Sequence, residues 1–334
     1  MPNISAGIIG TGYYLPEKVL TNFDLEQMVQ TSDAWIVERT GIHERRIADE
    51  GEPVSALAFR AAEMALADAG IAGEDLDLII MATLTSDRII PATACVLQDR
   101  LGAKHAAAFD LSAACSGFVY ASSIAAQFIE SGIYKYILVI GAETLSKVID
   151  WKDRNTCILF GDGAGAAVFG AVEQGYGIRA FDLGSDGSGG DALDIPSSGS
   201  LRPVTPETIE QRLNYVHMDG KAVFRFATKV MGRTVETSLQ KAGMKREELD
   251  FLVPHQANIR IIQSAAKRLD LPMEKVIINI HRYGNMSAAS IPVALAEAAH
   301  AHRFKKGDNV ALAGFGAGLT WASCVMKWAK EEYG

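Results

Sequence analysis

Three residues from distant parts of the sequence have side chains suited to nucleophilic chemistry, and the first is Cys115. It follows the strand-like run Ala106–Asp110 and opens, with small neighbours, a helix that we expect to run to about residue 131. The unpaired N–H groups and the dipole at a helix N-terminus favour a thiolate over a thiol, which makes a nucleophile at neutral pH. A buried structural cysteine, the commoner fate of this residue type, is the alternative that the position leaves open.

His255 and Asn285 complete the set. His255 comes just after the apolar run Leu249–Val253, so it stands at the carboxyl end of a predicted strand, where ligands of α/β sheets bind. Asn285 follows a glycine at the start of a small-residue helix, much as Cys115 does in its own segment. An asparagine that only caps this helix is the alternative. The remaining cysteines lie in helix- or strand-like runs and are predicted to be structural: Cys95, Cys157 and Cys324.

The elements that must position these residues alternate in type. Apolar residues recur at helical spacing over 55–69 and 223–242, and each segment ends in Ala-Gly, a usual helix stop. Short apolar runs at 77–83 and 249–253 follow and are typical of buried strands. Helices that alternate with buried strands predict the α/β class, with both faces of each sheet covered.

The same units occur twice along the chain. Residues 69–80 are echoed by residues 242–253, an offset of 173, and Ile137–Gly141 matches Val310–Gly314 at the same offset. Two matches at one offset indicate two duplicated halves, with the general likeness of helix-turn-strand units as the alternative. One long segment near the join of the halves, 184–215, is rich in Gly, Ser and Pro and is predicted to be a surface excursion or a lid.

Composition excludes several classes of protein. With 334 residues, 49% of them hydrophobic and 22% charged, the chain is expected to be globular, with one large domain or two packed ones. Its 32 basic and 40 acidic residues give a net charge of −8, which argues against a chain-wide nucleic-acid or anionic-membrane footprint but leaves room for a local basic patch. The four cysteines lack CxxC spacing, so neither a metal site nor a disulfide scaffold is predicted.

No N-terminal signal and no apolar run of about 18 residues are recognisable, so we expect a soluble cytoplasmic protein with reduced thiols. Glycine-rich strings at 10–12, 161–165 and 314–318 match neither GxGxxG nor GxxxxGK[ST] in the required context. Close backbone packing or an oxyanion hole is therefore favoured over nucleotide binding.

The motifs AACSGF around Cys115, PHQAN around His255 and YGNMSAAS around Asn285 resemble the β-ketoacyl-acyl carrier protein synthase III family of the thiolase superfamily. The likeness runs along the whole chain and includes GTG at 10–12, TSDAWI at 31–36, FGDGAGA at 160–166 and the segment 314–321. It implies a thiolase-like α/β fold of two duplicated halves in a five-layer αβαβα arrangement, with the active site between them. Residues 1–175 would carry the nucleophilic cysteine, and residues 176–334 the histidine and the asparagine.

The resemblance also implies the reaction, a decarboxylating Claisen condensation that initiates fatty-acid synthesis. Cys115 attacks an acyl-CoA thioester, and malonyl-acyl carrier protein then loses carbon dioxide and attacks the acyl-enzyme. His255 and Asn285 hydrogen-bond the malonyl thioester carbonyl, and backbone N–H groups of Cys115 and of the turn at Gly316 and Ala317 form the oxyanion hole. No cofactor and no metal are expected.

Substrate contacts carry over by the same resemblance. CoA is expected at Thr31, Trp35, Arg39 and Arg154, and the carrier protein at Gln256, Ala257, Asn258, Ile259, Arg260 and Arg225, with Lys267 and Arg268 as further candidates. Stacking of Trp and Arg on adenine and steering of an acidic partner by a basic patch are the physical reasons.

Two positions depart from the family's usual pattern. Ile90 stands where an aromatic residue commonly reaches the acyl pocket of the partner in a homodimer, so the chain length of the primer stays open. Ala317 replaces a common glycine, which keeps the N–H group but makes a positive φ costly.

Other functions remain alternatives at this stage. A ketosynthase or acyltransferase of secondary metabolism belongs to the same superfamily, and sequence separates it poorly from the main prediction. A papain-like hydrolase also uses Cys, His and Asn but lacks the internal repeat. A non-catalytic subunit that binds acyl carrier protein would normally have lost one of Cys115, His255 or Asn285, and all three are present.

Overall fold

The computed structural model describes residues 4–331 and consists of five layers, α-β-α-β-α. The first sheet has the order β1-β7-β6-β4-β5, with β1 (Ser5–Tyr14), β7 (Asp162–Val172), β6 (Ile137–Thr144), β4 (Leu78–Ala82) and β5 (Ala107–Leu111). The second has the order β11-β12-β13-β8, with β11 (Phe251–Pro254), β12 (Asn309–Gly316), β13 (Thr320–Lys327) and β8 (Gly177–Ser185). The predicted α/β class and five-layer thiolase-like arrangement are confirmed.

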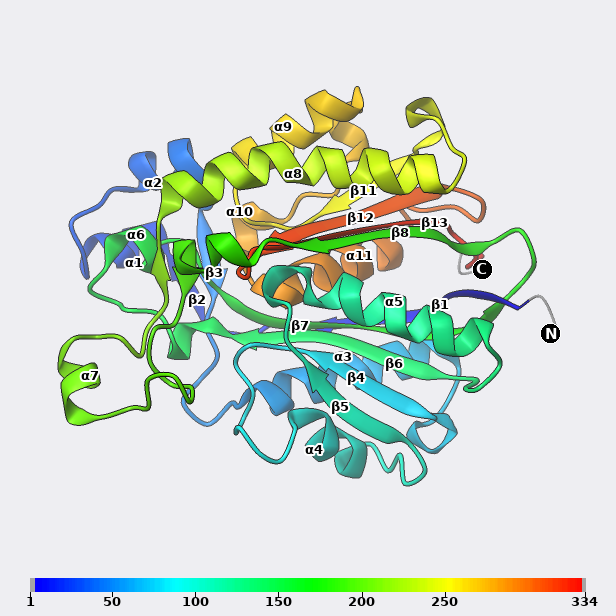
Figure 1. Ribbon diagram of the computed structural model, residues 1–334, viewed down its shortest axis with the longest axis horizontal. Helices are drawn as coiled ribbons and strands as arrows, with labels where there is room; N and C mark the ends of the chain where they lie inside the picture. The colour runs from blue at the N-terminus through cyan, green and yellow to red at the C-terminus, as the bar shows by residue number, and fades with distance from the viewer. Residues whose placement is uncertain (1–3, 332–334) are drawn as a thin grey trace.

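Helices form the other three layers. Figure 1 shows α8 (Gly220–Lys241) and α9 (Ile259–Leu269) above the second sheet, and α5 (Gly117–Glu130) and α11 (Ser290–His300) between the two sheets. The outer face of the first sheet is covered by α3 (Val54–Ala69) and α4 (Thr93–Arg100), which share one hydrophobic core with it. None of the helices within residues 4–331 is both long and apolar enough to cross a membrane.

The remaining elements are short, and those labelled in Figure 1 lie toward the left-hand end of the two sheets. They are β2 (Val19–Thr21), α1 (Asn22–Glu26), α2 (Asp33–Thr40), β3 (Glu44–Arg46), α6 (Arg154–Cys157), β9 (Leu193–Asp194), α7 (Pro206–Glu210), β10 (His217–Met218) and α10 (Ile280–Tyr283). The segment 184–215, predicted to be irregular, therefore contains the short pieces β9 and α7 and a 3-10 stretch, Gly187–Ala192.

The two sheets repeat one strand order. Taken in the same direction across each sheet, β4, β6, β7 and β1 correspond to β11, β12, β13 and β8, with the first pair parallel and the next two antiparallel in both sheets. An isolated parallel bridge between Leu252 and Val276 stands where β4 pairs with β5. The boundary that we predict between residues 175 and 176 falls in the turn from β7 to β8. Gene duplication remains our interpretation of this repeat.

The repeat extends to the turns that begin the two central helices. A 3-10 turn, Ala114–Ser116, precedes α5, and a second one, Ser287–Ala289, precedes α11 at the same offset of 173 residues. Ala114 and Ser287 both adopt positive φ, +47° and +45°. Non-glycine residues rarely do so, and such conformations persist where surrounding structure enforces them, often at functional sites.

Small residues let the central helix α11 lie directly on the first sheet. A Cβ atom added to Gly165 on β7 would lie 2.5 Å from Pro292 C and from Val293 N of α11. One added to Gly141 on β6 would lie 2.1 Å from the Ala288 carbonyl oxygen. Side chains at these positions would push the two halves apart.

We therefore expect Gly165→Ala to lower the free energy of unfolding by about 1–3 kcal/mol, the usual cost of overpacking a tight core. Gly51→Ala is the matched control, because a Cβ atom added there would meet no described atom within 4 Å and its φ lies outside the left-handed region; its effect should stay within about 0.5 kcal/mol. Urea denaturation followed by circular dichroism measures both. Equal effects of the two substitutions would contradict the close contact.

Candidate active site

Cys115, His255 and Asn285 come together at the boundary of two cavities. A large pocket of about 370 Å³ and a narrow one of about 100 Å³ share Cys115, Phe160 and Leu193 in their walls. All three predicted catalytic residues line the narrow pocket. The large pocket is lined mainly by apolar side chains: Leu84, Leu145, Phe160, Leu193, Ile195 and Val216. A nucleophile at such a junction can be reached from one side while its acyl group extends into the other.

Cys115 lies on the 3-10 turn before α5, as its sequence position predicts, but it is only 6% exposed. Burial raises the pKa of its thiol to about 12, and a hydrogen bond with Ser287 lowers it only in part. Burial therefore opposes the resting thiolate that the helix N-terminus predicts, and its effect on the pKa exceeds that of the hydrogen bonds that lower it. The resting group is a thiol, and its reaction requires that the proton be taken away.

His255 follows β11 directly, and its backbone N–H donates to Ala313 O at 2.7 Å. The ring is fully buried, and neither Nδ1 nor Nε2 has a hydrogen-bond partner among the described residues. Burial lowers the pKa of His255 to about 3, so the ring is neutral at physiological pH. Because buried polar atoms are nearly always paired, two orphaned ring nitrogens in a pocket indicate a place for a ligand's polar atoms.

Asn285 is held by its neighbours on both sides. Its Oδ1 accepts from Ser287 N at 2.8 Å, so the amide nitrogen is the group that the side chain offers to the narrow pocket. Its backbone pairs with the chain around Phe160, since Asn285 N donates to Leu159 O at 2.8 Å and Gly161 N donates to Asn285 O at 3.0 Å. The arrangement provides a neutral donor beside the neutral His255.

The predicted oxyanion turn lies against Cys115. A Cβ atom on Gly316 would be 2.6 Å from Cys115 N, so only glycine allows this approach. Ala317 lines the large pocket beside Cys115. The Thr320 hydroxyl lies 3.1 Å from both Ala113 O and Ala317 O, which ties the turn to the nucleophile's loop.

The residues predicted to bind CoA form a strip next to these pockets. The guanidinium carbons of Arg39 and Arg154 lie 4.6 Å and 5.0 Å from the centroid of the Trp35 ring. The Thr31 hydroxyl is buried without a hydrogen-bond partner among the described residues. A planar aromatic ring flanked by two guanidinium groups suits a purine base.

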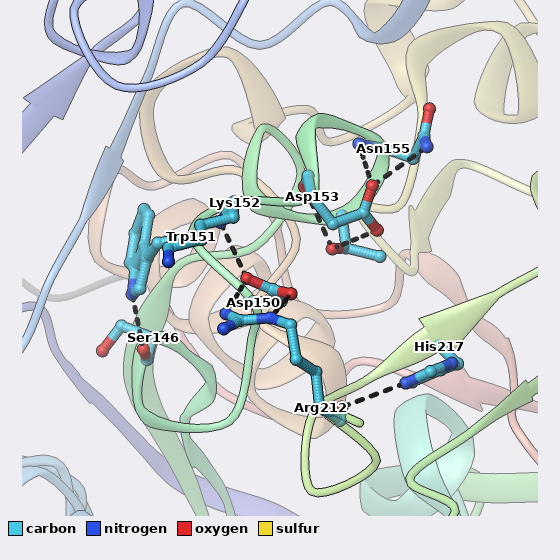
Figure 2. A network of polar contacts seen from close by, with 9 residues as sticks. Ser146, Asp150, Trp151, Lys152, Asp153, Asn155, Arg212 and His217 are labelled. Carbon is cyan, nitrogen blue, oxygen red and sulfur yellow. Dashed lines mark hydrogen bonds and ion pairs between the residues drawn. The ribbon is translucent and has the colours of Figure 1, made fainter. Parts of the chain in front are cut away.

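Figure 2 shows how the loop that carries Arg154 is supported. Asp150 forms a bidentate ion pair with Arg212, and Trp151 donates its indole N–H to Ser146 O at 3.1 Å. Asp153 caps α6 by accepting from Asn155 N at 3.0 Å. Because Arg212 belongs to the segment 184–215, that segment is fastened to the CoA strip. It also supplies Leu193 and Ile195 to the large pocket, so it forms a wall rather than a detached loop.

One predicted contact residue, Gln256, is placed differently from expectation, whereas Arg268 and Ile90 stay exposed to solvent. Gln256 is fully buried, and its amide bonds to Pro254 O, Ile277 O, Asn279 N and Ile280 N, so a direct carrier-protein contact by this side chain is wrong. Arg268 is bound to Glu236 through two hydrogen bonds. Ile90 is 82% exposed and does not line the large pocket of its own chain.

Of the cysteines predicted to be structural, Cys157 and Cys324 are buried and Cys95 is exposed.

Sequence reasoning missed three residues of the site: Glu143, Ser287 and Thr320. Glu143 was detectable as an acidic residue in an otherwise apolar strand, Ile137–Thr144. Ser287 was detectable through the repeat, because it is the counterpart of Ala114, the neighbour of the nucleophile. Thr320 carries no comparable pattern.

Comparisons with known proteins point to one family. Two family models match, 3-oxoacyl-[acyl-carrier-protein (ACP)] synthase III over residues 109–187 and the C-terminal model of the same name over residues 239–328. A β-ketoacyl-[acyl-carrier-protein] synthase III of Desulfitobacterium hafniense is 57% identical over 328 residues, covering 98% of this chain and 99% of the relative.

Solved structures give the same picture. The 3-oxoacyl-[acyl-carrier-protein] synthase III of Aquifex aeolicus is 48% identical with a TM-score of 0.89, covering 97% of this chain and all of that chain (100%). The corresponding enzyme of Pseudomonas aeruginosa is 44% identical with a TM-score of 0.90, covering 98% and 99%. The fold of this chain is therefore shared with many solved structures.

The buried state of His255 has a consequence for stability. Its pKa falls from 6.5 to about 3 on folding, so below pH 6.5 the unfolded chain binds a proton that the folded chain excludes, and stability falls as the pH falls. His255→Gln removes this contribution. Its free energy of unfolding should decline less steeply between pH 6 and 4, by about 1.4 kcal/mol per pH unit. Urea denaturation at several pH values measures the slope, and identical slopes would show that the ring can take up a proton in place.

Proposed function

The chain belongs to the β-ketoacyl-acyl carrier protein synthase III family, and from this premise we propose how its site carries out the reaction. It is a condensing enzyme that joins an acyl-CoA primer to malonyl-acyl carrier protein and so initiates fatty-acid synthesis. The observation that carries the proposal is the junction at Cys115, where the thiol meets an apolar pocket on one side and the unpartnered nitrogens of His255 on the other.

In the first half-reaction the Cys115 sulfur attacks the acyl-CoA thioester. The negative charge that develops on the carbonyl oxygen is stabilised by the backbone N–H groups of Cys115 and of the turn at Gly316 and Ala317, which lies against Cys115. The acyl chain enters the large pocket, whose apolar walls favour it over water. CoA leaves, and Cys115 carries the acyl group.

In the second half-reaction malonyl-acyl carrier protein loses carbon dioxide and attacks the acyl-enzyme. The enolate oxygen that forms accepts hydrogen bonds from His255 and Asn285 in the narrow pocket. A neutral imidazole and an amide stabilise this oxygen without first having to bury a positive charge. Because charge develops on oxygen in both half-reactions and these donors are sufficient, we propose that no cofactor takes part.

Substrate binding follows the surface near the narrow pocket. We place the adenine of CoA on Trp35, with Arg39 and Arg154 beside it. The carrier protein approaches the exposed Arg225 and Arg260, which lie on neighbouring helices. Asn258 connects the two surfaces, since it caps α9 and donates to Arg39 O at 2.8 Å. Ala257 and Asn258 line the narrow pocket. Ile259 packs against Gly41, where an added Cβ atom would lie 2.7 Å from the Ile259 Cβ.

A homodimer is part of the proposal. Among the described strands β5 pairs only with β4, so one of its edges is open to a second copy. Ile89 and Ile90 precede the helix next to β5 and are 88% and 82% exposed. These exposed apolar side chains suit a contact in which Ile90 reaches the acyl pocket of the partner subunit. A cytoplasmic location, where thiols stay reduced, also belongs to the proposal.

A separate observation disfavours each of the alternative functions. The relatives carry the name of the fatty-acid enzyme, which favours that function over secondary metabolism. A non-catalytic subunit would not need an orphaned histidine and an asparagine beside a cysteine at a pocket junction. A papain-like hydrolase needs an open peptide groove around its thiol, whereas the described residues enclose Cys115 and leave it 6% exposed.

Intact-protein mass spectrometry tests the two half-reactions. Incubation with acyl-CoAs of graded chain length should give an acyl adduct on the wild type and none on Cys115→Ala. Malonyl-acyl carrier protein should then discharge the adduct with release of carbon dioxide. His255→Ala and Asn285→Ala should still acquire the adduct but discharge it about 10²–10³-fold more slowly, the usual loss for one donor to a developing oxyanion. An adduct that is never discharged by the wild type would contradict condensation.

The carrier-protein surface is tested by charge reversal. Arg260→Glu should raise the KM for malonyl-acyl carrier protein about tenfold or more while acylation by acyl-CoA stays within a factor of about two, because rim charges act mainly on encounter. Lys305→Glu makes the same change of charge at an exposed turn away from α9 and is the control. Equal loss in both half-reactions of Arg260→Glu would rule out a specific carrier contact.

A further inference from the structure

Glu143 is a buried acid that the condensation scheme does not use. It lies on β6 and is fully buried. Its carboxylate accepts from Thr85 Oγ1 at 2.6 Å, from Thr83 Oγ1 at 3.2 Å and from Leu84 N at 3.1 Å. An acidic side chain is seldom left fully buried without a basic partner, so this one requires an explanation.

The hydrogen-bond donors around Glu143 have fixed directions. Thr85 Oγ1 accepts from Thr144 N at 2.9 Å, and Thr83 Oγ1 accepts from Thr85 N at 3.1 Å. Each hydroxyl is therefore turned so that its own proton points to Glu143. These hydrogen bonds favour the carboxylate, whereas burial favours the protonated acid. Burial has the larger effect, and the pKa of Glu143 rises to about 7. The group can exist in either form at neutral pH.

Ser287 connects Glu143 to the nucleophile. The Cys115 thiol donates to Ser287 Oγ, with 3.5 Å between sulfur and oxygen. The Ser287 side chain also acts on Glu143, since it lowers the pKa of both Cys115 and Glu143. It is held in place by its positive φ of +45° and by donation of its N–H to Asn285 Oδ1 at 2.8 Å. The turn that carries it lies directly on β6, where a Cβ on Gly141 would be 2.1 Å from Ala288 O.

We propose that Ser287 and Glu143 form a buried proton relay that accepts the Cys115 thiol proton during acylation and returns it after condensation. The proposal rests on the function given above. Ser287 contacts the reacting sulfur and is therefore a catalytic residue. Glu143 does not contact the sulfur; it acts on Cys115 through Ser287, as a positioning residue that holds the transferred proton. His255 keeps its role as a neutral donor to the malonyl carbonyl.

The relay balances protons over the whole cycle. The thiol proton passes to Ser287 Oγ as the serine proton passes to Glu143, so a thiolate and a neutral carboxylic acid replace a thiol and a carboxylate. The sulfur then forms its bond to the acyl carbon, the bond to CoA breaks, and the CoA thiolate takes one proton from solvent. Condensation later breaks the Cys115–acyl bond with the electron pair on sulfur, and Glu143 returns its proton through Ser287.

The charge of the site favours this arrangement. A thiolate made by loss of the proton to solvent would add a second negative charge beside Glu143, and this neighbour raises the pKa of Cys115. Transfer inside the site keeps a single negative charge and moves it to the nucleophile. The groups that act on Glu143 are Thr83, Leu84 and Thr85 after β4 and Ser287 before α11, and none of these ionises. Cys115 is the titratable partner of this pair.

Alkylation of Cys115 by iodoacetamide tests the relay without substrate, in a Cys95→Ser background because Cys95 is exposed. Between pH 6 and 8, Glu143→Gln and Ser287→Ala should each alkylate about tenfold more slowly than the parent. The double variant should be no slower than either single one, because the two residues act as a unit. Ser122→Ala, which removes a buried hydroxyl bonded to Phe118 O, and Glu297→Gln are matched controls that should alkylate at the parental rate.

Opposite outcomes separate the relay from a purely electrostatic role. If Glu143 acts only as a negative neighbour, its loss lowers the pKa of the thiol and alkylation becomes faster. A rate that is unchanged or increased in Glu143→Gln therefore overturns the proposal. Since no acyl-CoA is present, this failure is distinct from failure of the condensation itself, which appears as a missing or undischarged adduct on the wild type.

A measurement on the wild type keeps the proposal testable if the variants do not fold. Infrared difference spectra between free and acylated enzyme should show a protonated carboxyl band that appears on acylation and disappears when malonyl-acyl carrier protein discharges the acyl group. Absence of this band in fully acylated enzyme overturns the relay.

Discussion

The contact between the two 3-10 turns that precede α5 and α11, between the two sheets, determines where the chemistry takes place. Each helix begins with a 3-10 turn whose leading residue has a positive φ, Ala114 in one half and Ser287 in the other. The turns meet closely enough that the Cys115 thiol reaches the Ser287 hydroxyl. The repeat of the two halves thus brings the nucleophile Cys115 of the first half next to Asn285 and Ser287 of the second half. The site cannot form in either half alone.

The same contact determines the pKa values of the buried groups in the site. Because the helices are packed between two sheets, Cys115, His255 and Glu143 are all removed from water, and burial is the largest influence on the pKa of each. The resting site therefore favours neutral cysteine and histidine. Neutral donors suit a reaction whose charge appears on a carbonyl oxygen, since they need no counter-ion before substrate arrives. A buried thiol, in contrast, needs an internal proton acceptor, and this requirement gives a reason for an acid in an apolar strand.

Sequence alone predicted much of the fold and part of the site, and the division has a physical cause. Helical spacing over 55–69 and the apolar run at 77–83 reflect local burial, and both elements formed with nearly the predicted bounds. Position left structural alternatives open for Cys115 and Asn285, and these two residues and His255 were identified together by the motifs AACSGF, YGNMSAAS and PHQAN, which resemble those of the family. Burial of whole side chains depends on tertiary packing, so neither the satisfied amide of Gln256 nor the raised pKa of Cys115 could be predicted. The repeat marks Ser287 as the counterpart of Ala114, but its contact with Cys115, 172 residues away, depends on the same packing and could not be predicted.

The segment 184–215 connects the large pocket with the strip around Trp35, which its irregular sequence does not predict. Leu193 and Ile195 line the large pocket, and Arg212 is paired with Asp150 on the loop that leads to Arg154. The Arg212 guanidinium lowers the pKa of Asp150, which indicates that the pair is favourable in the folded chain. One wall of the large pocket and one side of the strip around Trp35 are thus both supported by the segment 184–215. Because the two parts of an acyl-CoA must be held at a fixed separation from Cys115, a common support limits how far either can move without the other.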